Sequence, residues 1–91
     1  MVRPRKKRRI RSNPEVLYFK PRGIPLNTLK EVILTHEEVE ALRLYHILDL
    51  DQTESANRLG VSQSTFHRTL SSAQQKIAQA IINGKAIRIN I

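Results

Sequence analysis

The second half of the chain contains two helix N-cap patterns, and a glycine ends the first helix just before the second begins. This spacing leaves little freedom in how the segment folds. Asp51 begins an Asp-Gln-Thr-Glu pattern, in which its side chain caps a helix over residues 52–59. Gly60 follows at the position just beyond that helix, where a left-handed backbone favours glycine. Ser62 is the next N-cap and begins a helix over residues 63–83. Two helices joined by so short a turn cross steeply and share a small core.

The residue types on these two helices fit a steep crossing. Ala56 is small at the point where the helices cross, and Leu59 and Val61 supply the shared core together with the long helix. The long helix carries one apolar stripe with spacings of 4, 3, 4 and 4 residues: Phe66, Leu70, Ala73, Ile77 and Ile81. The pattern predicts a helix-turn-helix unit with an extended second helix.

Shorter elements flank this unit on both sides. Thr35 and Glu38 form a capping box that begins a helix running to about Leu48. Three segments have the pattern of short strands: residues 16–19, 31–34 and 86–91. We therefore predict a mainly α fold over residues 14–91, with a helix-turn-helix core and short β-strands before and after it.

The basic charge of the chain is concentrated at its start. The sequence holds 16 Lys and Arg against 8 Asp and Glu, a net charge of +8. Seven of the positive residues lie in the first 11 positions, and the other 80 residues carry a net charge of only +1. Residues 1–13 are therefore predicted to be a flexible basic arm that contacts DNA phosphates or enters the minor groove. The basic residues of this arm are Arg3, Arg5, Lys6, Lys7, Arg8, Arg9 and Arg11.

Composition disfavours several other classes of function. No apolar run approaches the roughly 18 residues of a membrane span, and no amphipathic anchor accompanies the basic arm, so we expect no membrane binding. Cysteine is absent and the histidines lack the spacing of a helical metal clip, so we expect no metal and no cofactor. No nucleophile elbow or glycine-rich phosphate loop is present, so we expect no catalytic residue and no enzyme. His46 is expected to be a partly buried packing residue. Glu37, Glu38 and Glu40 are expected to lie on a solvated face.

The first exposed residues of the long helix are the candidate DNA contacts. In a helix-turn-helix the start of the second helix faces the major groove, where polar side chains reach base edges or phosphates. The predicted contacts are Gln63, Ser64, Thr65, His67 and Arg68. Arg58 and Lys76 are basic residues near the motif and are predicted to contact phosphates.

A homodimer is also expected. About eighty residues make only a marginal core, and helix-turn-helix proteins commonly read paired half-sites. The strand over residues 86–91 needs a partner, which is either 16–19 or 31–34, in the same chain or in a second one. We expect the dimer.

The whole pattern resembles a family of small, largely uncharacterised prokaryotic proteins that are predicted to bind DNA. The resemblance spans roughly Arg3 to Ile89 and is carried by the segments PEVLYFKPRGIPL, EVILTHEEVEALRL, LGVSQSTFHRTLSSAQQKIAQAI and NGKAIRI. The helix-turn-helix of that family is similar to region four of the sigma-seventy class of RNA polymerase sigma factors, within the winged-helix-like superfamily. The resemblance implies a cytoplasmic, nucleoid-associated prokaryotic protein that binds DNA.

The chain departs from that family in its cysteine content. Members of the family often hold cysteines near the positions of Lys7, Arg11 and Ser12, whereas this chain contains none. A thiolate metal site or redox role therefore does not carry over to this chain.

These observations favour sequence-specific binding of double-stranded DNA in transcriptional regulation. Two alternatives remain open. One is a protein-interaction module that docks on RNA polymerase or another partner through a sigma-like fold. The other is an RNA-binding protein, for which the basic arm would suffice although the sequence lacks an exposed aromatic platform for stacking bases.

Overall fold

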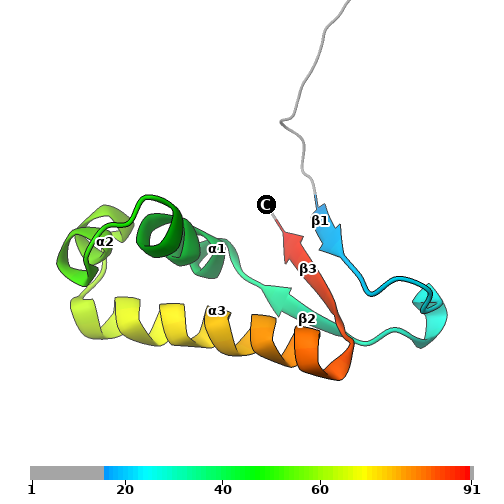
Figure 1. The fold of residues 1–91 in the computed structure, drawn as a ribbon. Coiled ribbons are helices and arrows are strands. Elements are labelled where there is room, and N and C mark those ends of the chain that lie inside the picture. Colours follow the sequence, from blue (N-terminus) through cyan, green and yellow to red (C-terminus); the bar gives the residue numbers. More distant parts are fainter. Residues whose placement is uncertain (1–15, 91) are drawn as a thin grey trace, which may run out of the picture.

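Figure 1 shows a long helix that carries two further helices at one end and a small sheet at the other. The computed structural model describes residues 16–90. The helices are α1 (His36–Leu42), α2 (Gln52–Leu59) and the long α3 (Gln63–Asn83). The strands are β1 (Val16–Phe19), β2 (Glu31–Leu34) and β3 (Ala86–Asn90), and a 3-10 turn, η2 (Leu26–Thr28), precedes β2. The described chain is therefore mostly helical with a three-stranded sheet, as predicted.

The ends of α2 and α3 follow from the predicted caps. The Asp51 carboxylate accepts a hydrogen bond from the amide of Glu54 at 2.8 Å, and Ser62 Oγ accepts one from the amide of Thr65 at 3.2 Å. Gly60 has a φ of 79°, in the left-handed region that strains most L side chains, and it ends α2. The predicted bounds of both helices are confirmed.

The first helix differs from its prediction. α1 ends at Leu42, and the chain continues as a π-helical turn, η3 (Arg43–Ile47), rather than as regular helix to about Leu48. The amide of Leu48 donates at 2.9 Å to the first carbonyl of η3, five residues back. This wider turn changes the direction in which the following side chains point. Leu44 is therefore 1% exposed, whereas Ile47 is 75% exposed.

β3 is the central strand of the sheet, whose order is β1-β3-β2. It pairs antiparallel with β1, where Phe19 lies opposite Ile87, and parallel with β2, where Leu34 lies opposite Ile89. Both predicted partners of the C-terminal strand are confirmed, and both belong to the same chain. The argument for a dimer tied together by this strand therefore no longer applies.

Two apolar clusters divide the core along α3. Phe66 and Ala56 are 0% and 2% exposed and belong to the cluster in which α1, α2 and α3 meet. Further along α3, Ala73 packs against Leu34 and Ile89 of the sheet. The N-terminal half of α3 thus holds the helical unit and the C-terminal half holds the sheet. The first turn of α3 therefore lies at the end of the molecule remote from the sheet (Figure 1).

Candidate nucleic-acid interface

The connection between α2 and α3 consists of residues 60–62 only. The amides of Gly60 and Val61 both donate to the Ala56 carbonyl, at 2.9 and 3.0 Å, and so close the end of α2 before the chain turns. The partly buried Val61 packs against the cluster that contains Phe66. This arrangement is compatible with a helix-turn-helix, and it presents the start of α3 at the surface.

The predicted base contacts lie together at the start of α3. Gln63, Ser64, His67 and Arg68 are exposed, and Thr65 is half-buried. Gln63 Nε2 donates to a threonine hydroxyl of α2 at 3.0 Å, and Arg68 Nη2 donates to Thr65 Oγ1 at 3.2 Å. Exposed hydrogen bonds of this kind contribute only about 0.5–1.5 kcal/mol each. A ligand that offers comparable acceptors can therefore replace them.

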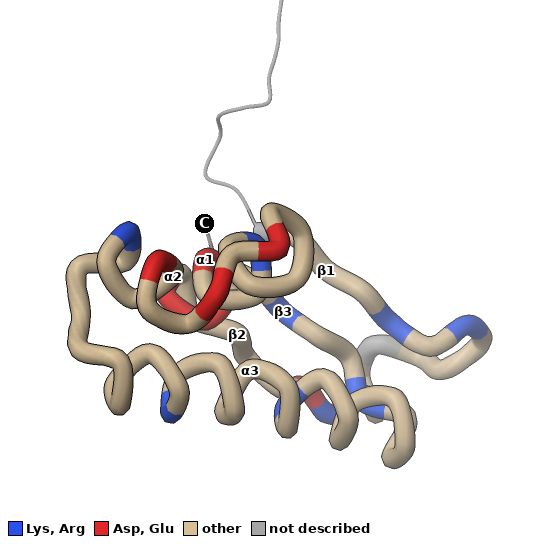
Figure 2. Tube along the Cα trace, turned by 60° about the vertical axis from the view of Figure 1, so that its left-hand side comes forward, with Lys and Arg blue, Asp and Glu red and all other residues tan. Residues whose placement is uncertain are grey.

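The outer face of α3 is polar, and α3 itself contains no acidic residue. Ser64, Arg68, Ser71 and Gln75 are spaced by 4, 3 and 4 residues, which puts them on the side of the helix opposite the buried Phe66. Many of the Asp and Glu residues of the described chain gather over α1 and α2 (Figure 2). A polyanion can therefore run along the outer face of α3 without meeting a carboxylate of that helix.

Ser71 and Gln75 were not among the predicted contacts. Their position is set by the same helical spacing that places Ser64 and Arg68. The signal was therefore present in the sequence, as a polar stripe on the side of the helix opposite its apolar stripe.

Arg58, one of the two predicted phosphate contacts, lies on α2 with its side chain 54% exposed. Its Nε donates to a Glu54 carboxylate oxygen at 3.1 Å. An exposed pair of this kind contributes at most about 1 kcal/mol. The Arg58 guanidinium therefore stays accessible to a phosphate.

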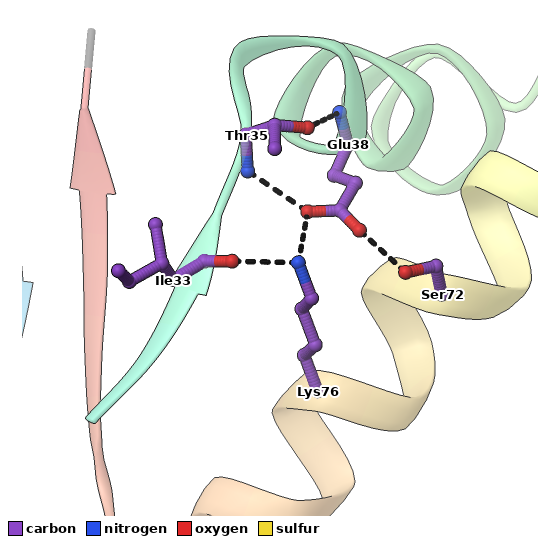
Figure 3. A network of polar contacts seen from close by, with 5 residues as sticks. All are labelled: Ile33, Thr35, Glu38, Ser72 and Lys76. Carbon is purple, nitrogen blue, oxygen red and sulfur yellow. Dashed lines mark hydrogen bonds and ion pairs between the residues drawn. The ribbon is translucent and has the colours of Figure 1, made fainter. Parts of the chain in front are cut away.

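Lys76, the other predicted phosphate contact, is half-buried and bound to other elements of the fold (Figure 3). Its ammonium donates to Glu38 Oε1 at 2.9 Å and to the carbonyl of Ile33 at 2.7 Å. These two bonds turn the side chain toward α1 and β2 and give it a structural role. We therefore leave Lys76 out of the interface proposed below.

Glu38 is the central acceptor of this network. The residue is 5% exposed, and its carboxylate accepts hydrogen bonds from the Thr35 amide at 2.8 Å, the Ser72 hydroxyl at 2.5 Å and the Lys76 ammonium (Figure 3). Burial alone would raise the pKa of the Glu38 carboxyl, but the bonds from Ser72, Thr35 and Lys76 hold it below its ordinary value. The prediction of a solvated face is therefore wrong for Glu38, because folding brings a lysine from 38 positions away beside it.

His46 is exposed on η3, so the prediction of a partly buried packing residue is wrong. The wider turn carries its ring to the surface. There His46 Nε2 accepts a hydrogen bond from Gln74 Nε2 at 2.8 Å, and the ring lies edge-on to Tyr45 with 5.2 Å between the centroids.

Residues 16–90 show neither a metal site nor a membrane span. In that part of the chain, His, Asp and Glu side chains form no group of three that could hold a metal ion. None of the helices described there is both long enough and apolar enough to cross a membrane.

The predicted basic arm lies outside the described residues. The candidate contacts that belong to it are Arg3, Arg5, Lys6, Lys7, Arg8, Arg9 and Arg11.

These features define a small, mostly helical protein with an exposed, polar and acid-free helix face. A family model described as "Protein of unknown function DUF134" matches residues 1–90, and the chain belongs to that family. The expected membership of a small, uncharacterised prokaryotic family is thereby confirmed.

Several bacterial relatives match nearly the whole chain. UPF0251 protein TTE1845 of Caldanaerobacter subterraneus subsp. tengcongensis is 57% identical over 89 residues, which are 98% of this chain and 75% of that protein. UPF0251 protein Teth514_1147 of Thermoanaerobacter sp. is 53% identical over 98% of this chain and 79% of its own length. UPF0251 protein DET0218 of Dehalococcoides mccartyi is 52% identical, with coverages of 98% and 76%. No solved structure matches the chain.

Proposed function

We propose that this protein binds double-stranded DNA in a sequence-specific manner and regulates transcription. The observation that carries the proposal is the α2–α3 unit, in which a three-residue turn presents an acid-free, polar helix face at one end of the molecule. A helix of this kind fits the major groove of B-form DNA, where it reads base edges. The proposed role is one of binding, without a catalytic residue or cofactor, at the nucleoid of a bacterial cytoplasm.

The residues of the interface have different proposed tasks. Arg68 offers the planar pair of donors that recognises guanine, and Gln63 offers the donor and acceptor that recognise adenine. Ser64, Thr65 and His67 contact base edges or phosphates beside them. The exposed Arg58 and the basic residues of the arm contact phosphates, which supply affinity without sequence choice.

The proposal is tested by one titration series. The full chain is titrated into labelled duplex DNA, duplex RNA and single strands of the same sequence at several salt concentrations. Selection from a random duplex library supplies the preferred DNA site. We expect the tightest binding to duplex DNA, a preferred site that is bound at least tenfold more tightly than random DNA, and an affinity that falls steeply with salt.

The two alternative functions give different results in the same series. A protein that docks on RNA polymerase would show no DNA affinity and a salt-insensitive association with the polymerase. An RNA-binding protein would prefer duplex or single-stranded RNA to DNA. Either result would overturn the proposal.

A further inference from the structure

A continuous apolar trough lies on the side of the sheet that faces the helices. We define it by Phe19, Leu42, Ile47, Ile77, Ile81 and Ile87, which are among its lining residues. It consists of two adjoining hollows of about 490 and 290 Å³, which share Phe19 and Ile87. Its lining residues come from β1, β2, β3, α1, η3 and α3.

The trough exposes large apolar side chains that a core would normally bury. Phe19 is 58% exposed, Ile47 is 75% exposed and Ile81 is 72% exposed. β1 continues the apolar face of the sheet, but the helices pack mainly over β2 and β3, so Phe19 stays uncovered. Apolar surface gathered in this way is typical of an interaction site rather than of ordinary protein surface.

We infer that a second copy of this chain covers the trough and that the protein is a symmetric dimer through this face. The surface holds both a hollow and exposed side chains at its rim, among them Ile47. In a two-fold symmetric dimer, the rim side chains of each copy can pack into the hollow of the other. Sixteen residues line the two hollows, and the exposed Leu17 lies on the same face of β1 as Phe19. This footprint is close to the roughly 20 residues per partner at the lower end of stable interfaces.

The charges along the trough support the same arrangement. The hollow beside η3 is lined by Arg43, whose guanidinium is paired with Glu40 at 2.6 Å. The hollow at the other end is lined by Lys20 and Lys85. Figure 2 shows the acids over α1 and α2, and lysines and arginines around the loop after β1. A two-fold axis across the trough reverses one copy against the other. Lys20 and Lys85 of each copy then lie toward the end of the partner's trough where Glu40 accompanies Arg43.

The basic arm does not suit the trough. It carries seven positive charges in eleven residues. Among the described residues that line the trough there is no Asp or Glu to compensate them. Burying unpaired charges against apolar walls is strongly unfavourable.

Dimerisation through the trough leaves the proposed DNA face exposed. Ile77 faces the trough, and Arg68 precedes it by nine residues, which is two and a half turns of α-helix. The two side chains therefore point to opposite sides of α3. The inference does not depend on DNA binding, since the oligomeric state is measured without DNA.

The first test measures mass in solution. Light scattering and analytical ultracentrifugation at tens of micromolar should give twice the chain mass for the wild type. Phe19→Asp and Ile47→Asp should each give the mass of one chain, with helical circular dichroism retained. Ile33→Asp is the matched control, because Ile33 is 48% exposed on the other face of the sheet, and it should stay dimeric. A wild type that is monomeric at high micromolar concentration, or trough variants that remain dimeric, would overturn the inference.

The second test does not depend on a disruptive variant. The chain has no cysteine, so Ile47→Cys gives a unique site for a spin label. Spin-labelled chains without ¹⁵N are mixed with wild-type ¹⁵N chains that carry no spin label. Loss of NMR signal in the ¹⁵N chains then comes only from contact between copies. We expect selective broadening at Phe19 and Ile87, and no selective broadening from a label at Ile33→Cys. Equal spectra with the two labels would contradict a dimer through the trough, even if an aspartate variant had unfolded.

Discussion

Glu38 performs two structural tasks with one carboxylate. It completes the capping box at the start of α1, where it accepts the Thr35 amide, and it also binds Ser72 and Lys76 of α3. An acid at the third position of a helix is ordinary, and the capping pattern predicts it from sequence. The contacts to α3 depend on residues far along the chain, and only the fold brings them together. Through them, Glu38 links α1 to the helix that carries the proposed DNA face.

Glu38→Gln should lower the free energy of unfolding by about 1–3 kcal/mol at neutral pH, because the Lys76 ammonium loses its charged partner. Lys76 is one-third exposed, so water compensates part of the loss. The folded pKa of Glu38 lies below its unfolded value of about 4.5. The charged carboxylate therefore stabilises the fold above that value, and the stabilisation is lost as the pH falls through the folded pKa. Urea unfolding measured from pH 7 down into the acid range should show a larger loss for the wild type than for Glu38→Gln.

Glu37→Gln is the matched control for this measurement. Glu37 is the neighbouring residue and is exposed. Its replacement should change the free energy of unfolding by less than about 0.5 kcal/mol. Equal losses in the two variants at pH 7 would show that the Glu38 network does not stabilise the fold.

Asp49 has a φ of 60° in the turn that joins η3 to α2. A side chain in this left-handed conformation is strained, and glycine relieves that strain. Asp49→Gly should therefore be more stable than Asp49→Ala by about 1 kcal/mol. In the interior of α3 the order should reverse, so that Gln75→Ala is more stable than Gln75→Gly by about 1 kcal/mol. Thermal melts of the four variants provide the comparison, and the same order at both positions would refute a strained backbone at Asp49.

At the scale of elements, the sequence predicted what depends on neighbouring residues and missed what depends on distant ones. The caps at Asp51 and Ser62 and the glycine between them are local features, so the bounds of α2 and α3 followed from them. The π-helical turn η3 carries no comparable local signal, and the predicted helix therefore ran too far. The partners of β3 were predicted, but the expected pairing between two chains was wrong, because both partners belong to the same chain. After the crossover through α3, β3 lies between β1 and β2 of the same chain.

The candidate site follows the same division. Exposure at the start of α3 was predictable from helical spacing, which is why most of the predicted contacts lie together at the surface. Lys76 was selected for its charge and its nearness to the motif alone, and those two criteria say nothing about its orientation toward Glu38.

The proposed reading of bases by α3 predicts a specific effect for two of its residues. Arg68→Ala, on the outer face of α3, should weaken binding to the preferred duplex site by about 1–3 kcal/mol and should weaken binding to random DNA less. Gln63→Ala should behave in the same way at its own base pair. Lys30→Ala is the control, because Lys30 is exposed beside the sheet, at the end of the molecule remote from the start of α3. Fluorescence anisotropy with both DNAs measures the ratio, and unchanged preferred-site binding in both α3 variants would show that the wrong face was chosen.

At the scale of the whole molecule, three surfaces have separate proposed tasks. The outer face of α3 reads the DNA sequence, the trough binds a second copy, and the basic arm contacts phosphates. Arg68 and Ile77 lie on opposite sides of α3, so the first two tasks do not compete for the same surface. A symmetric dimer would present two outer faces and two arms to one duplex, as proteins that read paired half-sites do.

The arm should therefore supply affinity and leave sequence choice to α3. Deletion of residues 1–11 removes seven positive charges. We expect the arm to neutralise about four to six phosphates. The slope of log K against log salt should then become shallower on truncation by roughly 0.9 for each phosphate contact that is lost. The ratio of preferred-site to random-site affinity should change little, because phosphates carry no sequence information. Arg68→Ala in the full chain should do the opposite, lowering that ratio while changing the salt slope by no more than about 1. A truncated chain with the salt slope of the full chain would show that the arm does not touch the duplex, and a fall in the affinity ratio on truncation would place part of the sequence reading in the arm.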